Sequence, residues 1–173
     1  MEIRLTVDKG AVMREVAVTT AYTGGKMEGD ENAFNRISTV DEDEKHLERF
    51  WEESRADLCQ ELIGLVKYEG MSNGPVEPDV PFTPKEDRGP VAEDMRPRYE
   101  LLLEVSRSFD TALLASMQLS LFSYFVHNIA AKWYIYTNKG EAGEYADKAT
   151  TLLDDIHRKA VYKKRPTRPT YDD

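Results

Sequence analysis

Residues 111–131 contain no charged side chain, and this uncharged run constrains the fold more than any other feature of the sequence. It reads TALLASMQLSLFSYFVHNIAA and continues into Lys132-Trp133-Tyr134. Its composition predicts a helix, and a helix that is apolar on nearly all sides must be enclosed by protein or by lipid. The rest of the chain is ionic, since 32% of its 173 residues are charged. Other helices, or other copies of the chain, must therefore cover this run.

A membrane span is the first alternative for the uncharged run, because about 20 apolar residues cross a hydrocarbon core. Polar side chains within it argue against a span, since lipid offers them no hydrogen-bond partner. They are Ser116, Gln118, Ser120, Ser123, His127 and Asn128. The flanks Asp110 and Lys132 also lack a strongly basic loop that would orient a span. We therefore expect no membrane contact.

Small and polar side chains gather on one side of the helix predicted over 111–137, in a stripe about 80° wide at 100° per residue. The stripe comprises Ala112, Ser116, Ser120, Ser123 and His127. Small side chains allow a neighbouring helix to approach closely, so the pattern predicts the central helix of a bundle or a helix shared between subunits. The candidate interface residues on this helix are Ser116, Ser120, Ser123, His127, Trp133 and Tyr134.

The first half of the chain contains one strand pattern and two helix patterns. Alternation over 2–8 predicts a half-buried strand, while 11–22 favours a helix, although its β-branched residues also suit a strand. Residues 26–35 read as a polar connection. A hydroxyl cap at Ser38-Thr39, followed by four acids, predicts the start of a long amphipathic helix that ends near Val66.

The second half predicts a strand over 98–105, paired with 66–69 or with the N-terminal strand, and a last helix over 141–160. The fold class is therefore mainly α: a helical bundle of three to four helices with a long central apolar helix and a minor β-hairpin or short strands.

Prolines divide the chain into regular and irregular parts. A single helical domain is predicted over 1–165, with an irregular Pro-rich insertion over 70–97. Insertions of this length are usually functional or disordered, and a partner-contacting arm is one reading of this one. Residues 166–173 are predicted to form a flexible tail.

The net charge of −9 and pI near 4.9 argue against strong nucleic-acid binding, which needs a basic surface. The charge is uneven, with acids at 41–44 and bases near the C-terminus that include Lys163, Lys164 and Arg165. Such polarity can direct head-to-tail contact between copies, although solvated helix ends also explain it. These three bases complete the candidate interface. A lone Cys59 and an N-terminus without a signal-peptide pattern indicate cytoplasmic synthesis.

No pattern in the sequence defines a catalytic, cofactor-binding or metal-binding site. The histidines at 46, 127 and 157 have no ligand spacing between them, and the acids at 41–44 lack the glycine and glutamate of a calcium loop. Gly24-Gly25-Lys26 lacks the first glycine and the hydroxyl residue of a phosphate loop. The alternative hypothesis is an enzyme or small-ligand-binding helical protein with a pocket near His127.

Four segments follow one another along the chain: FWEESRADL at 50–58, the insertion, the apolar helix ending in KWYIYTNKGEAGEYADKATTLLDDI (132–156), and the basic Arg-Pro tail. This order resembles that of a class of phage proteins. These are the small helical structural proteins encoded among head and tail genes of tailed phages and prophages. The resemblance covers most of 38–168 and lies in arrangement, so no functional residue is carried over. It implies a non-enzymatic head–tail connector-like or head-completion protein that forms a homo-oligomer, contacts other structural proteins and associates with a virion.

Overall fold

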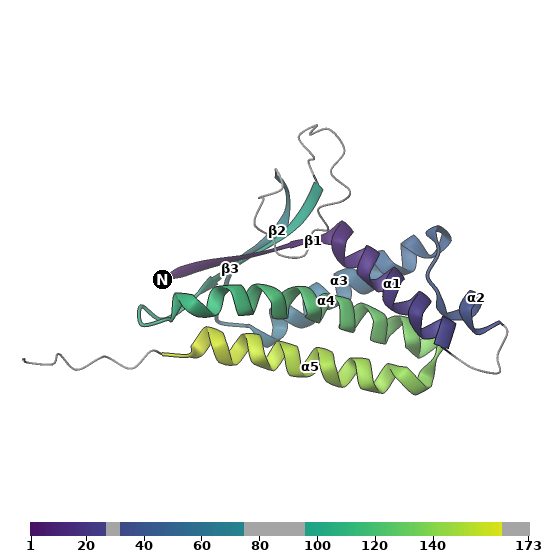
Figure 1. Ribbon diagram of the computed structural model, residues 1–173. Helices are drawn as coiled ribbons and strands as arrows, with labels where there is room; N and C mark the ends of the chain where they lie inside the picture. The colour runs from purple at the N-terminus through teal and green to yellow at the C-terminus, as the bar shows by residue number, and fades with distance from the viewer. Residues whose placement is uncertain (27–31, 75–95, 164–173) are drawn as a thin grey trace, which may run out of the picture.

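The computed structural model describes residues 1–26, 32–74 and 96–163. Its described residues form five α-helices, two short 3₁₀ turns and three strands, so the fold is mainly α. In chain order these are β1 (Glu2–Asp8), α1 (Lys9–Lys26), α2 (Ala33–Ile37), η1 (Asp41–Asp43), α3 (Glu44–Glu61), β2 (Val66–Gly74), β3 (Arg96–Glu104), η3 (Thr111–Leu113), α4 (Leu114–Thr137) and α5 (Lys139–Val161). Figure 1 shows α4 and α5 as a long antiparallel pair, with the sheet over the N-terminal half of α4 and α1 over its C-terminal half.

The three strands form one antiparallel sheet in the order β1-β3-β2. The sequence left two partners open for the strand near residue 100, and β3 pairs with both of them. Leu101 of β3 lies opposite Leu5 of β1 on one side and Glu69 of β2 on the other. Alternate residues of β1 face the helices, because Ile3, Leu5 and Val7 are buried. The predicted strand over 2–8 is thus confirmed.

A side chain from α4 occupies the outer edge of β1. The backbone N–H of Thr6 donates to the amide oxygen of Gln118 at 3.0 Å, and the amide nitrogen of Gln118 donates to the carbonyl oxygen of Thr6. An edge strand otherwise presents free N–H and C=O groups that can pair with another chain. Gln118 therefore closes this position of the edge and ties the sheet to α4.

The hydrophobic core lies between the sheet and the helices. Phe125 of α4 stacks on Trp51 of α3 with ring centroids 4.4 Å apart, and it meets Tyr99 of β3 edge-on at 5.3 Å. Helix α4 contacts α1, α3, α5 and β1, so elements of the same chain cover much of the uncharged run. Its apolar residues Leu119 and Ile135 remain exposed. No helix among the described residues is long and apolar enough to cross a bilayer.

Helix α1 confirms the predicted helix over 11–22 and continues through Gly24. Gly24 is buried against α2, where a Cβ atom would lie 2.9 Å from the Cα of Phe34. This glycine therefore serves close helix packing and does not end the helix. The predicted polar connection over 26–35 is wrong in its last residues, because α2 begins at Ala33 and buries Ala33 and Ile37.

The predicted cap of the next helix at Ser38-Thr39 is wrong. The Ser38 hydroxyl donates to the carbonyl of Phe34 at 2.6 Å, and α3 begins only at Glu44. The predicted end near Val66 is also wrong, since α3 ends at Glu61. Gly64 has φ +90°, a left-handed conformation that stops a helix and here leads into β2.

The later boundaries also differ from the prediction. Helix α5 begins at Lys139, two residues before the predicted start at 141. The predicted insertion over 70–97 is wrong at both ends, because 70–74 belong to β2 and 96–97 to β3. Its other residues, 75–95, and the predicted tail over 166–173 lie outside the described residues.

Candidate functional site

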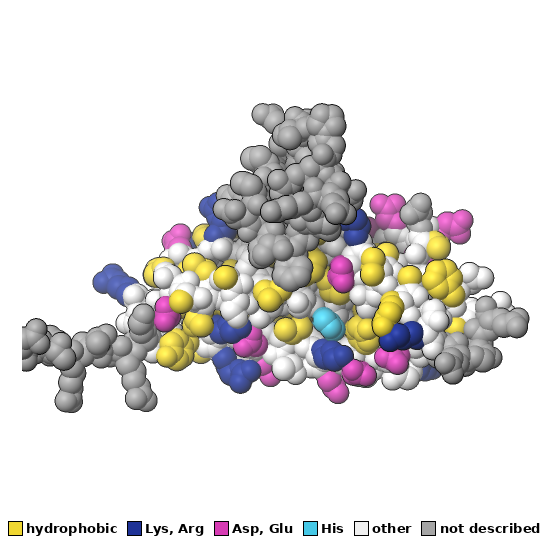
Figure 2. Space-filling view, viewed as in Figure 1, with side chains coloured by type: hydrophobic (Ala, Val, Ile, Leu, Met, Phe, Trp, Pro, Cys, Tyr) yellow, Lys and Arg dark blue, Asp and Glu magenta, His cyan; other side chains and the backbone are white. Residues whose placement is uncertain are grey.

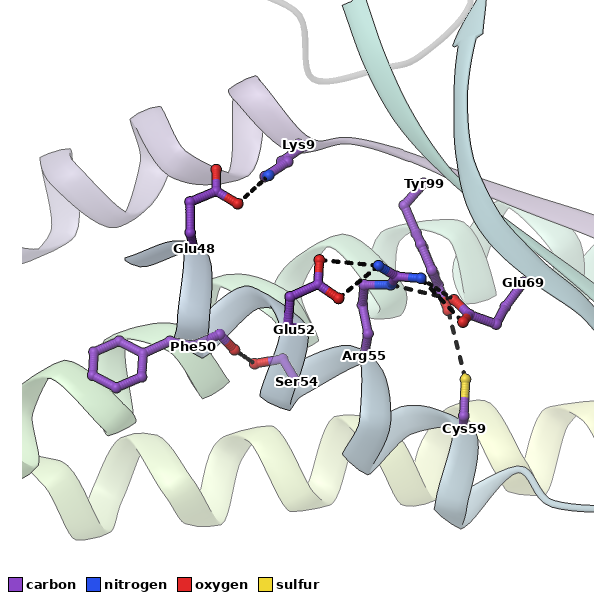
Figure 3. Close-up of polar contacts among 9 residues, drawn as sticks. All are labelled: Lys9, Glu48, Phe50, Glu52, Ser54, Arg55, Cys59, Glu69 and Tyr99. Atoms are coloured by element: carbon purple, nitrogen blue, oxygen red, sulfur yellow. Dashed lines mark hydrogen bonds and ion pairs between the residues drawn. The ribbon is translucent and has the colours of Figure 1, made fainter. Parts of the chain in front are cut away.

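Arg55 of α3 lies at the centre of a polar cluster between α3 and the sheet, shown in Figure 3. Its Nη2 donates to the two carboxylate oxygens of Glu69 on β2 at 2.8 and 3.0 Å. Its Nη1 donates to Glu52, one turn earlier on α3, at 2.7 Å. Hydrogen bonds of this charge-assisted, two-oxygen kind are among the stronger ones in proteins. One guanidinium thus joins a helix to a strand.

Tyr99 and Cys59 complete this cluster. The Arg55 guanidinium lies 5.5 Å from the ring centroid of Tyr99, and the Cys59 Sγ lies 3.9 Å from the Tyr99 hydroxyl. Burial raises the pKa of the Cys59 thiol and strongly raises the pKa of the Tyr99 phenol. Burial therefore favours the protonated forms of the thiol and the phenol.

The predicted small-residue stripe of α4 faces α5 of the same chain. The Ser120 hydroxyl donates to Asp155 of α5 at 2.8 Å, and Lys159 donates to the Ser116 hydroxyl at 2.6 Å. Lys159 and Asp155 also form an ion pair. Burial raises the pKa of Asp155, but hydrogen bonds from Lys159 and Ser120 outweigh it, so the pKa lies below its ordinary value. The seam between α4 and α5 is thus polar where it is half-exposed.

His127 and Ser123 line a groove between α4 and α5. The Nδ1 atom of His127 lies 2.7 Å from the carbonyl oxygen of Ser123, and a carbonyl only accepts, so Nδ1 carries a hydrogen. In the neutral ring the Nε2 atom is therefore an acceptor. The His127 ring lies 5.5 Å from that of Tyr145. The groove has a volume of about 500 Å³ and is lined by Ser123, His127, Glu144, Asp147, Lys148, Thr151 and Leu152.

Figure 2 shows the side of the molecule on which α4 and α5 lie in front. Hydrophobic side chains there alternate with acidic and basic ones along both helices, with no large area of one kind. The lining of the groove is mixed in character, since it combines Leu152 with the charged side chains of Glu144, Asp147 and Lys148. It can contact an apolar ligand body and a charged group at the same time.

Trp133 and Tyr134, both predicted as candidate interface residues, lie in the interior of the fold. The Trp133 indole N–H donates to the carbonyl of Ile37 at 2.7 Å, and the Tyr134 hydroxyl donates to Thr23 at 2.9 Å. Lys163 is exposed, whereas Lys164 and Arg165 lie outside the described residues. The structure thus brings Ser116, Ser120, Ser123 and His127 together along α5, and Lys163 follows the C-terminal end of that helix.

A second polar contact, between α3 and α4, was not identified from the sequence. The Tyr124 hydroxyl donates to the backbone carbonyl of Ser54 at 3.0 Å, and the Asn128 amide donates to the Ser54 hydroxyl at 3.0 Å. Tyr124 and Asn128 are four residues apart, so they share one face of α4. That spacing was the available signal, but it does not reveal Ser54 as the partner.

The described residues contain no group of three or more His, Cys, Asp or Glu side chains placed to hold a metal ion. No protein-family model, curated protein or solved structure matches the chain. Any functional assignment must therefore rest on the geometry of the chain itself.

Proposed function

We propose that this chain is a non-enzymatic structural protein that assembles with copies of itself, as a head–tail connector-like component of a phage or prophage. The proposal rests mainly on where the polar and the hydrophobic side chains of the described residues lie. The polar clusters make contacts within the chain, whereas several large hydrophobic side chains face outward.

The outward hydrophobic side chains include a pair on α1. Val18 and Tyr22 are each 62% exposed, and their four-residue spacing places them side by side on the helix. Ile63 and Tyr136 are exposed by 82% and 70%. Single exposed hydrophobic residues are common, but adjacent ones that can be buried together favour a protein interface.

The contacts of the chemically capable side chains support a non-enzymatic role. Arg55 is engaged by two carboxylates, and burial keeps Cys59 protonated. The arrangement of insertion, apolar helix and basic tail resembles that of head–tail connector-like proteins, and this resemblance supports the phage assignment. The proposal includes cytoplasmic synthesis, incorporation into a virion and contacts with other structural proteins.

Light scattering coupled to size-exclusion chromatography tests self-assembly. Over concentrations from about 1 μM upward, which suit an interface with a micromolar Kd, the mass should exceed that of one chain. The double variant Val18→Glu/Tyr22→Glu should shift the equilibrium toward the monomer. Arg14→Glu, at an exposed position on the same helix, is the matched control because it changes the net charge by the same two units. A wild-type mass equal to one chain at all concentrations contradicts the proposal.

A second candidate function is a small-ligand-binding protein, which the groove at His127 favours. Native mass spectrometry of the purified chain tests it. A small molecule that adds to the mass of wild type but not to that of His127→Phe supports ligand binding. The absence of such an added mass from wild type counts against this function.

A further inference from the structure

We propose that the groove beside His127 on one copy binds the C-terminal segment 164–171 of a second copy. This inference rests on the proposed function, because it requires self-association. It adds a second contact between copies, besides the Val18 and Tyr22 pair on α1, and gives this contact a direction.

The groove suits a basic segment that also carries apolar groups. Leu152 and the methyl group of Thr151 supply apolar contact, while Glu144 and Asp147 supply carboxylates. Lys148 is the one base in the lining, and it donates to Glu144 at 2.6 Å and lies over the Tyr145 ring. The lining therefore holds two carboxylates and one base. The field at the groove therefore favours a cation.

The sequence of the C-terminal segment is complementary to the groove. It reads KRPTRPTY over 164–171, with three bases and no acid before Asp172. Arginine pairs with carboxylates through a planar fork of donors, and proline and threonine methyl groups contact apolar surface. Each proline also fixes its own φ, so an extended segment loses less conformational entropy on binding.

A four-residue part of the segment matches the length of the groove. Along α5 the lining residues from Glu144 to Leu152 span about 12 Å at 1.5 Å per residue. An extended chain covers about 3.3 Å per residue, so about four residues fill this length. Arg165 to Arg168 provide four residues with a base at each end.

The end of α5 favours docking on a second copy over docking on the same chain. The helix ends at Val161, beyond the groove residues, and Tyr162 is extended with φ −64° and ψ 134°. A chain that folds back at a helix end commonly uses a left-handed residue there. Tyr162 shows no such reversal, so the described end of the chain does not turn back toward its own groove.

Two variants of the full chain test the contact between copies. The segment variant is Lys164→Gln/Arg165→Gln/Arg168→Gln, and the groove variant is Glu144→Gln/Asp147→Asn. Each should weaken self-association at least tenfold in sedimentation equilibrium. An equimolar mixture should associate more strongly than either variant alone, because the first variant retains the groove and the second retains the segment. Glu15→Gln/Asp154→Asn, which neutralises two exposed acids outside the groove, should assemble like wild type.

The outcomes separate this inference from the proposed function. If wild type assembles and both variants assemble equally well, the inference is overturned and the assembly role stands. If both variants are monomeric and their mixture stays monomeric, docking between copies is overturned. If wild type itself is monomeric, the proposed function fails and this inference fails with it. Thermal melting checks that the variants fold.

A synthetic peptide provides an independent measurement. Peptide KKRPTRPTYDD, added to the full chain, should shift the imidazole NMR signals of His127 and reduce self-association by competition. The same peptide with glutamine at its four basic positions should do neither. Equal shifts with both peptides, or none with the first, overturn the proposed site.

Discussion

The guanidinium of Arg55 and the carboxylate of Glu69 meet through two oxygen atoms at 2.8 and 3.0 Å, which joins α3 to β2. The two side chains are 17% and 31% exposed, so water screens the pair only in part. The contact connects the helical part of the fold to an edge strand of the sheet. It is therefore expected to stabilise the packing of β2.

Arg55→Met should lower the free energy of unfolding by about 1–3 kcal/mol, because Glu69 would keep a half-buried charge without this donor. Urea denaturation measures the change. The matched control is Arg49→Met on the same helix, whose ion pair with Glu53 is 3.3 Å long and about half-exposed. The control should lose less than about 1 kcal/mol. Equal losses of unfolding free energy in the two variants would show that the Glu69 contact stabilises the fold no more than an exposed ion pair does.

Gln118→Leu should open the outer edge of β1 at Thr6, because both hydrogen bonds to that residue are lost. Hydrogen exchange of the Thr6 amide should become faster, and stability should fall by about 1–3 kcal/mol. Gln118→Glu is the control, since its carboxylate can still accept from the Thr6 N–H. It should retain more protection of that amide than the leucine variant. Unchanged exchange in Gln118→Leu contradicts the edge contact.

Ser120→Leu should destabilise the seam between α4 and α5 by about 1–3 kcal/mol, because the larger side chain overpacks a buried position and Asp155 loses a donor. Ala115→Leu, at an exposed position on the same helix, is the control. Melting temperatures of the two variants provide the comparison. A Ser120→Leu melting temperature equal to that of wild type would mean that the seam is open at this point.

Asp155 should make stability depend on pH in acid. Its pKa in the folded chain lies below the ordinary value of 3.8, so the unfolded chain binds more protons in the window between the two values. The stabilisation is therefore complete above this window and is lost as pH falls through the folded-state pKa.

Urea unfolding of wild type and Asp155→Asn across pH 2–6 measures this contribution. The stability difference between them should be constant at the upper end and shrink below about pH 4. Lys159→Met removes the ion-pair partner. In that background, Asp155→Asn should change the pH dependence of the unfolding free energy by a smaller amount. If the stability difference between wild type and Asp155→Asn instead grows as pH falls, the lowered pKa of Asp155 is contradicted.

Local patterns predicted most elements of this fold because they depend on neighbours along the chain. The alternation over 2–8 identified β1, and the spacing of apolar residues identified parts of α1, α3 and α5. Boundaries failed where a distant contact decides them. Gly24 lies within α1 where a Cβ atom would be 2.9 Å from the Cα of Phe34, and nothing near Gly24 in the sequence indicates that contact.

The sequence predicted only one side of the candidate site. The spacing of Ser116, Ser120 and His127 revealed one side of the seam, whereas Asp155 and Lys159 on the other side belong to a different helix. Arg55 lies within the predicted amphipathic helix, and no local pattern indicated its partner Glu69, which comes from a strand that begins after the helix has ended. Pairings between elements depend on tertiary packing, which periodicity does not encode.

The middle position of β3 has a consequence for biosynthesis. Strand β1 emerges from the ribosome about ninety residues before its partner β3 is translated, and the nitrogen of Met1 donates to the carbonyl of Val105 across a separation of 104 residues. Contacts so distant along the chain slow folding, since a large loop must close before they form. Nascent β1 must therefore wait for its partner until β3 has left the exit tunnel.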